Sequence, residues 1–252
     1  MIELFEFLLV GLGVGLVSSY LGFGGGTIIV PFLPWISGYD IKTTLATSLV
    51  VVCLNATVNT VTFTKKKMVP WKLVGVIGVG AMLASFGASF LTSHLSIVLV
   101  KCLAISMFIF LLFVSHFGSR MLPIAFLSAG YRNYFSAGVV LGTASGMSGV
   151  GGGTFLVPVL SASGWVLPAQ VSPTGNALNM ISALVGAATM YLSGSPVQWK
   201  AALTIFAAAV VTSFVANQRQ HLLEPTQRKK YVTLFLGLVV VIQIVDALRL
   251  HG

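Results

Sequence analysis

Two glycine triplets, each followed by threonine, carry the residue pattern best suited to binding a ligand. They are Gly24, Gly25, Gly26 and Thr27 in the first half, and Gly151, Gly152, Gly153 and Thr154 in the second half. A short apolar run follows each triplet and has Pro31 or Pro158 in its expected first turn. Proline is tolerated there because the first four amides of a helix have no intrahelical partner. Each triplet therefore predicts the start of a helix.

These helix starts could hold an anion without any lysine or arginine. Glycine lets backbone amides approach a ligand closely, and the N-terminal end of a helix carries partial positive charge. Thr27 and Thr154 could cap the helices or contact the ligand. A second interpretation is that the glycines only let helices pack closely, as small residues do in membranes. The position of the triplets beside half-length helices favours binding.

Polar residues in a later segment of each half form a second set of candidates. They are Thr44, Ser48, Asn55, Asn59 and Thr62 in the first half, and Ser172, Asn176, Asn179, Ser182 and Gly186 in the second. Their spacing of three, four or seven residues places each set on one helix face. Such stripes could only join helices, through hydrogen bonds of about 1 kcal/mol each, or they could line a path beside the glycine triplets.

If the stripes line that path, the sequence predicts one substrate site built from both halves. Its residues are Gly24, Gly25, Gly26, Thr27, Thr47, Ser48, Asn55, Asn59, Gly151, Gly152, Gly153, Thr154, Thr174, Gly175, Asn176 and Asn179. We expect Thr47, Ser48, Thr174, Gly175 and Asn176 to lie nearest the helix starts. No catalytic residue, metal ligand or cofactor is expected.

The acidic residues argue against a cation site. Glu3, Glu6, Asp40, Glu224 and Asp246 all lie near the ends of apolar segments or in loops. A carboxylate-based cation site or proton relay is therefore not expected at membrane depth. Because interior positive charge is missing too, amide dipoles and hydroxyl groups would have to hold the anion.

The composition requires a membrane protein. Of 252 residues, 56% are hydrophobic and only 8% are charged, and the mean hydropathy is +0.98. Apolar runs long enough to cross about 30 Å of hydrocarbon favour α-helical spans over a barrel. The formal net charge of +9 comes from short basic clusters between these runs, which suits orientation signals better than nucleic-acid binding. The acidic start, with Glu3 and Glu6, is atypical of a cleaved signal peptide.

The chain contains two copies of one unit. The two triplets and their sequels match at a shift of 127 positions, which also superposes Gly11 on Gly138 and Gly15 on Gly142. The sequence predicts a first unit at 1–117, a basic cytoplasmic linker at 118–132 and a second unit at 133–252, together forming one transmembrane domain. The apolar segments are expected at about 4–21, 27–37, 43–63, 70–92 and 95–117, and at about 133–149, 154–164, 170–193, 198–218 and 228–248.

The second segment of each unit has about 11 residues, or roughly 16 Å of helix, which is half a membrane. If it forms a re-entrant hairpin with the first segment, three net crossings follow in each unit and the two units are inverted. The basic residues then divide unequally between the two faces. Those on one face are Lys65, Lys66, Lys67, Lys72, Arg120, Arg132, Arg219, Arg228, Lys229 and Lys230; the other has Lys42, Lys101, Lys200 and Arg249.

This charge bias favours inverted repeats, with both termini outside and the basic loops in the cytoplasm. A full first crossing would place the basic clusters on opposite faces and remove the bias. The predicted fold is an all-α polytopic membrane protein of two inverted repeats, each a broken hairpin followed by three transmembrane helices. Broken helices in inverted repeats are typical of secondary transporters and place the substrate near the bilayer midplane.

At these residues the chain resembles the TauE/SafE sulfite exporter family. The resemblance rests on the doubled glycine motif, the pair Thr47 and Ser48, and Trp71 and Trp199 with their following lysines. It implies export or uptake of a small anion such as sulfite, a sulfonate or sulfoacetate across a bacterial inner membrane. We expect a secondary transporter that exports such an anion by alternating access. Family members often have a Thr-Ser pair in the second half too, where this chain has Thr174 and Gly175. The expected partners are this anion, a proton as a candidate coupling ion, and the lipid bilayer.

Two other functions fit parts of the pattern. A passive anion channel would result if both glycine breaks opened together, and flux against a gradient would exclude it. An intramembrane serine protease is suggested by Gly146-Met147-Ser148-Gly149, which matches the G-x-S-G pattern. Such an enzyme also needs a histidine at membrane depth, whereas every histidine lies near a segment end or in a loop.

If the transporter couples to a proton, that proton would travel on the substrate, on water or on a peripheral histidine.

Overall fold

The computed structural model describes residues 2–21, 24–121, 130–218, 233–234, 236–243 and 245. These residues form helices and connecting turns, with no β-strand among them. The helices are α1 (Ile2–Leu21), α2 (Gly26–Ser37), α3 (Ile41–Lys65), α4 (Trp71–His94), α5 (Ile97–Met121), α7 (Tyr131–Ser148), α8 (Gly152–Ser163), η1 (Pro168–Gln170), α9 (Val171–Leu192) and α10 (Trp199–Gln218). Residues 236–243 are helical as well.

Five of the described helices are long and apolar enough to cross a membrane: α1, α3, α4, α5 and α10. Their outward faces carry large apolar side chains, such as Leu83 and Phe86 on α4 and Val98 on α5, which are more than half exposed. Exposed apolar side chains on this scale suit contact with lipid. The prediction of an all-α polytopic membrane protein is confirmed.

The predicted segments match these helices to within two residues, except that α5 continues to Met121, beyond the expected end at 117. Residues 122–129 of the predicted linker 118–132 lie outside the described residues. Parts of the last predicted segment, 228–248, also lie outside them. The division into two units and a linker stays a prediction.

Helices α2 and α8 are the half-length elements. Each has 12 residues, or about 18 Å of helix. They begin at the glycine triplets and end at Gly38 and Gly164, whose φ angles of 64° and 67° lie in the left-handed region that suits glycine. Pro31 and Pro158 lie in the second turn rather than the first, because the helices begin earlier than the proline pattern alone suggests.

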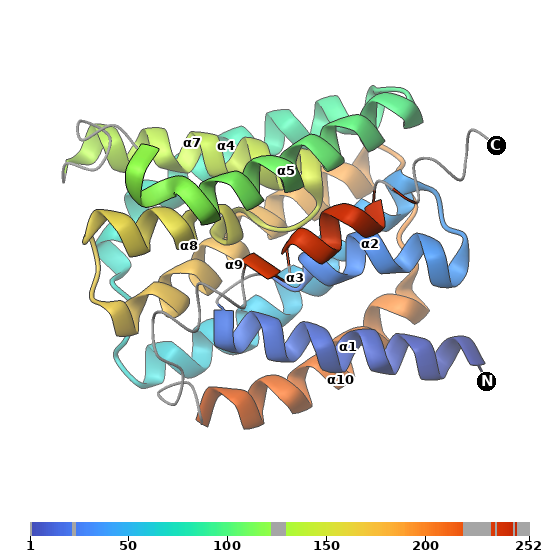
Figure 1. Cartoon of the computed structure of the whole chain (residues 1–252), viewed down its shortest axis with the longest axis horizontal. Helices are drawn as coiled ribbons and strands as arrows, with labels where there is room; N and C mark the ends of the chain where they lie inside the picture. Colours follow the sequence, from blue (N-terminus) through green and yellow to red (C-terminus); the bar gives the residue numbers. More distant parts are fainter. Residues whose placement is uncertain are drawn as a thin grey trace.

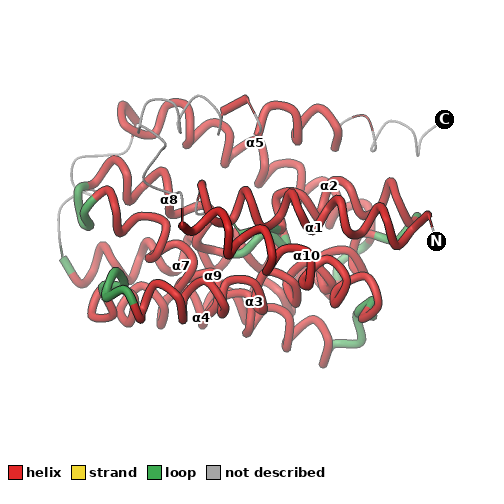
Figure 2. The backbone as a smooth tube through the Cα atoms, turned by 90° about the horizontal axis from the view of Figure 1, so that it is seen from below, coloured by secondary structure: helices red, strands yellow, loops and turns green. Residues whose placement is uncertain are grey.

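The most buried long helices, α3 and α9, cross at the centre of the molecule. Figure 1 shows α1 and α10 along one side and α4 and α7 along the other, with α3 and α9 between them. In Figure 2 the same elements form one helical body without strands in the described part. Each outer pair combines one helix from each half of the sequence, since α1 packs on α10 and α7 packs on α4.

Helices α3 and α9 run in opposite directions. Asn59 donates to Asn176, and the thiol of Cys53 donates to the carbonyl of Met180 at 4.0 Å, so the numbering falls in α9 as it rises in α3. The two helices occupy equivalent positions in the sequence repeat. An inverted pair requires such equivalents to be antiparallel. The inversion across a membrane, with both termini outside, stays a prediction that this crossing favours.

Small residues bring the outer helix pairs together. A Cβ placed at Gly142 of α7 would contact the carbonyl oxygen of Ala81 in α4 and lie 2.8 Å from its Cα. Gly15 of α1 occupies the equivalent position against α10, where a Cβ would contact the side chain of Thr212. By contrast, a Cβ at Gly87 of α4 would have no neighbour within 4 Å. Backbones at this separation tolerate glycine and little else.

We expect Gly142→Ala to destabilise the protein by about 1–3 kcal/mol, because the added methyl group overpacks the contact between α7 and α4. Gly87→Ala is the matched control, since its methyl group enters open space. Thermal unfolding of the detergent-purified protein measures both variants. An unchanged melting temperature for Gly142→Ala would show that this contact is looser than described.

Candidate functional site

The two glycine breaks meet at the centre of the protein. A Cβ at Gly24 would contact the carbonyl oxygen of Val150, and one at Gly26 would lie 2.5 Å from the Cα of Val150 and 2.6 Å from the carbonyl oxygen of Gly149. The amide of Gly24 donates to the hydroxyl of Thr154 at 2.7 Å, which joins the first break to the second. Each half therefore contributes directly to one site.

Gly151 is the position in this site that most clearly requires glycine. Its φ angle is 91°, in a region that residues with a side chain rarely adopt. A Cβ there would also lie 2.5 Å from Oδ1 of Asn179 and 2.8 Å from a methyl group of Val52. The missing side chain lets the second break lie directly against α3 and α9.

Protein hydroxyl groups already bind two of the glycine amides. Thr154 accepts from Gly24, and Ser182 of α9 accepts from the amide of Gly152 at 2.9 Å. No side chain of the described residues binds the other amides of the two triplets, which belong to Gly25, Gly26, Gly151 and Gly153. A ligand oxygen could accept from amides of this kind at the start of a helix.

The amide side chain of Asn179 is the most unusual polar group here. It is completely buried, and neither its nitrogen nor its oxygen has a hydrogen-bond partner among the described residues. Nδ2 lies 3.1 Å from the Cβ position of Gly24. Buried polar groups are nearly always paired, so an exception requires an explanation. At this place the explanation we favour is a ligand.

The site is asymmetric although the scaffold is duplicated. At the repeat shift of 127, the position of Asn179 corresponds to Val52, so an amide in the second half replaces a methyl-bearing side chain in the first. Thr154 reaches across to Gly24, whereas Thr27 donates only to the carbonyl of Gly24 within its own turn, at 3.4 Å. The two breaks therefore do not offer the same groups.

Ser48 and Gly175 lie at equivalent positions in the repeat, and each lies against the half-helix start of its own half. The hydroxyl of Ser48 donates to the carbonyl of Gly149 at 2.7 Å and lies 2.9 Å from the Cβ position of Gly26. The carbonyl of Gly175 contacts Gly153 so closely that no Cβ fits there. The structure thus brings both residues to the breaks.

Thr47 and Thr174 bind backbone groups of neighbouring segments. Thr47 accepts from the amide of Gln198, just before α10, at 3.0 Å, and Thr174 donates to the carbonyl of Gln170 at 2.7 Å. Neither hydroxyl has a hydrogen bond to a glycine triplet in the described structure. That both residues lie nearest the helix starts stays a prediction.

The asparagines of the stripes form a buried polar cluster with α1. Nδ2 of Asn59 donates to Ser18 at 3.1 Å and to Oδ1 of Asn176 at 3.2 Å, and Ser18 donates to the same oxygen at 3.2 Å. Asn55 accepts from Ser213 of α10 at 3.1 Å, while its Nδ2 has no partner among the described residues. For Asn59 and Asn176, joining helices is the role that these contacts support.

All sixteen predicted binding residues are buried. The close contacts of Gly24, Gly26 and Gly151 leave no room for an anion in the described arrangement. Binding would therefore require the two half-helix starts to separate.

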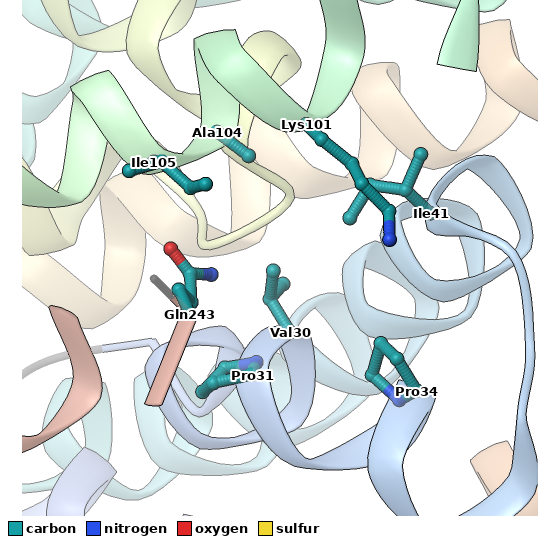
Figure 3. A pocket seen from close by; sticks show the side chains of 8 residues that line it. All are labelled: Val30, Pro31, Pro34, Ile41, Lys101, Ala104, Ile105 and Gln243. Carbon is teal, nitrogen blue, oxygen red and sulfur yellow. The ribbon is translucent and has the colours of Figure 1, made fainter. Parts of the chain in front are cut away.

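A separate groove lies beside α2, at Val30, Pro31 and Pro34. Figure 3 shows Lys101 and Gln243 extending into it, with Val30, Pro31 and Pro34 of α2 along the other wall. Lys101 is partly exposed, whereas Gln243 is buried and its Oε1 has no partner among the described residues. The groove carries a cation that the glycine breaks lack, but it was not predicted as a site.

Comparison with known proteins places the chain in a family. A family model described as sulfite exporter TauE/SafE matches residues 7–244. The chain belongs to the TauE/SafE family. A relative from Haemophilus influenzae, named as a probable membrane transporter protein, is 26% identical over 253 residues, with 92% of each chain covered. Another of that description from Methanocaldococcus jannaschii is 27% identical over 205 residues, with 76% of each covered. No solved structure matches.

The family and the names of these relatives support a membrane transporter. The serine protease alternative gains nothing from the geometry of this TauE/SafE protein. Ser148 is completely buried, and its hydroxyl donates to the carbonyl of Ala144 in its own helix at 2.6 Å. Of the two described histidines, His94 is exposed at the end of α4, where its Nδ1 lies 2.8 Å from the carbonyl oxygen of Phe90, and His116 is exposed on α5. A nucleophile would need its base within hydrogen-bond reach.

Three residues of the site were missed in the predicted set. Ser182 binds the amide of Gly152, Val52 contacts Gly151, and Ser18 joins Asn59 to Asn176. Ser182 belonged to the polar stripe, so its face was predictable, although its partner was not. The sequence repeat could have singled out Val52, because it is the counterpart of Asn179.

Thr154→Val should destabilise this TauE/SafE protein by about 1–3 kcal/mol, because the buried amide of Gly24 would lose its acceptor. Thr27→Val is the matched control: its hydroxyl only donates to the carbonyl of Gly24 at 3.4 Å, so we expect a smaller loss. Chemical or thermal unfolding of both purified variants gives the comparison. Equal losses would mean that the contact between the two breaks adds no stability of its own.

Proposed function

We propose that this TauE/SafE protein is a secondary transporter that exports a small sulfur-containing anion, such as sulfite or an organosulfonate like sulfoacetate. The anion binds between the two glycine-rich half-helix starts near the bilayer midplane. One observation carries the proposal: two helix N-termini from opposite halves meet at a buried point where the amide of Asn179 has no partner among the described residues. Helix N-termini attract anions through unpaired amides and the helix dipole.

Sulfur enters the proposal from the family, whose matching model is described as a sulfite exporter. The anion class has independent support in the described acidic residues. Glu3 and Glu6 lie in the first turns of α1, and Asp40 precedes α3. An acidic side chain at the centre would repel an anion, and the described residues bring none to the glycine breaks.

Alternating access is the mechanism that the closed packing favours. In the described arrangement the breaks contact one another directly, so an anion would bind only after one side of the α3 and α9 crossing loosens. A passive channel needs both sides open at once. For the cell we propose the bacterial inner membrane, with the basic loops in the cytoplasm and both termini outside.

Bulky substitution in the breaks should abolish transport. In Gly152→Val the new side chain starts 3.0 Å from the carbonyl oxygen of Leu141 and from the hydroxyl of Ser182, so it blocks the helix start that the anion uses. Gly25→Val is the equivalent change in the first half. We expect flux of sulfite into or out of proteoliposomes to fall at least about tenfold in either variant. The reason is that the anion loses one or more charged hydrogen bonds to the amides of the helix start.

Gly87→Val and Gly75→Val are the controls, because a Cβ at either glycine has no neighbour within 4 Å. Size-exclusion profiles establish that each variant is folded before flux is measured. Sulfate, thiosulfate, sulfoacetate and taurine rank the substrates, with chloride as the reference anion. Normal flux through both break variants would refute the site. Flux that only runs down the electrochemical gradient of the anion, and never against it, would identify a channel.

A further inference from the structure

The unpaired amide of Asn179 restricts the chemistry of the ligand more than a helix N-terminus does. An amide side chain has a donor nitrogen and an acceptor oxygen on the same carbon. Both atoms are buried and unpaired among the described residues. Both atoms are unpaired whichever way the amide is turned, so either assignment of its nitrogen and oxygen leaves one donor and one acceptor unpaired.

A fully deprotonated anion can satisfy only half of this amide. Its oxygens accept from Nδ2, but Oδ1 would then face negative charge with no donor. A buried acceptor left without a partner is unfavourable, and a site that hydrogen-bonds an O–H group discriminates strongly against analogues that lack one. No side chain beside Asn179 supplies the donor: Gly24 and Gly151 have no side chain, and Val52 contributes only methyl groups. The amide of Gly24 already donates to Thr154, and the amide of Gly151 is one of those left for another oxygen of the ligand.

Resting on the function proposed above, we propose that the transported species is a singly protonated oxyanion, which carries an O–H group and an accepting oxygen on the same central atom. Of the anions named above, this selects singly protonated sulfite over the sulfonates, whose sulfur carries no O–H group. The O–H donates to Oδ1 of Asn179 while a second oxygen accepts from Nδ2. The remaining oxygen faces the amides of the glycine breaks. The donor and acceptor atoms of Asn179 are bonded to the same carbon. A ligand whose donor is an ammonium group, joined to its acid group by a carbon chain, therefore does not pair with both atoms in this way.

This pairing also assigns the route of the proton. Among the described residues, no carboxylate or imidazole group lies at the breaks: Glu3, Glu6, Asp40, His94 and His116 are at helix ends or on exposed faces. The proton then crosses as part of the ligand, without transfer to the protein. Transport depends on pH through the protonation of the ligand and not through a side chain of the central site.

Methanesulfonate and methylphosphonate provide a direct test. The methylphosphonate monoanion has nearly the shape and the same charge as methanesulfonate. It has phosphorus in place of sulfur and carries one O–H group that methanesulfonate lacks. Equilibrium binding to the purified full-length protein is measured for both, from the pH at which methylphosphonate is a monoanion to the pH at which it is a dianion. We expect the monoanion to bind at least about tenfold more tightly than methanesulfonate, with the advantage lost as the ligand loses its last proton.

Asn179→Leu should remove most of that difference, and Asn179→Ser serves as a smaller change if the leucine variant does not fold. Equal affinity of the wild-type protein for the two ligands, or tighter binding of the dianion, would overturn the inference while leaving anion binding intact. A difference that persists in the folded Asn179 variants would overturn it too. Failure of methylphosphonate, methanesulfonate and sulfite all to bind would instead refute the proposed function.

Discussion

The structure depends on one constraint: two helices begin inside the protein, where water cannot satisfy their first amides. A helix start in an apolar environment needs other partners for up to four N–H groups. The two breaks solve part of this problem for each other, because Thr154 accepts from Gly24, and α9 solves another part through Ser182. The crossing of α3 and α9 brings these partners to one place.

The glycine-lined outer pairs serve the same constraint. Helix α1 leads into the first break and packs on α10, while α7 leads into the second and packs on α4. Each half therefore supports the helix that delivers the other half's chain to the centre. If one pair separated, the break at its end would lose its position against the opposite break. Movements at the periphery can thus act directly on the central site.

The two halves also differ at the place where a ligand would bind. The helix lengths and the outer glycine contacts are nearly the same in both halves, whereas the centre has Asn179 against Val52 and Ser48 against Gly175. An exact duplicate would surround the ligand with the same groups twice. A small oxyanion with one O–H group is itself asymmetric, and an asymmetric site matches it better.

The sequence predicted the helices well because long apolar runs and glycine punctuation are local signals. It placed α2 and α8 correctly as half-length elements, and it identified the family from the repeated glycine motif. It could not predict how α3 and α9 are aligned, since periodicity defines the face of a helix but not its partner. For that reason the sequence did not show that the hydroxyl of Thr47 accepts from the amide of Gln198.

The same limit explains why Asn179 was not distinguished from Asn59 and Asn176. All three occupy polar stripes, but only the structure shows that two of them are paired within the protein while Asn179 is not. Loop charge carried the prediction of inverted units and their orientation. The antiparallel crossing of α3 and α9 favours the inversion, and the orientation in the membrane stays a prediction.

Anomalous scattering from crystals of the wild-type protein grown with selenite would locate the bound anion. Selenium marks the position of an oxyanion without relying on the shape of its density. We expect a selenium peak between the two glycine breaks, beside Gly24, Gly151 and Asn179. A peak only in the groove between Lys101 and Gln243, with the breaks unoccupied, would contradict this expectation.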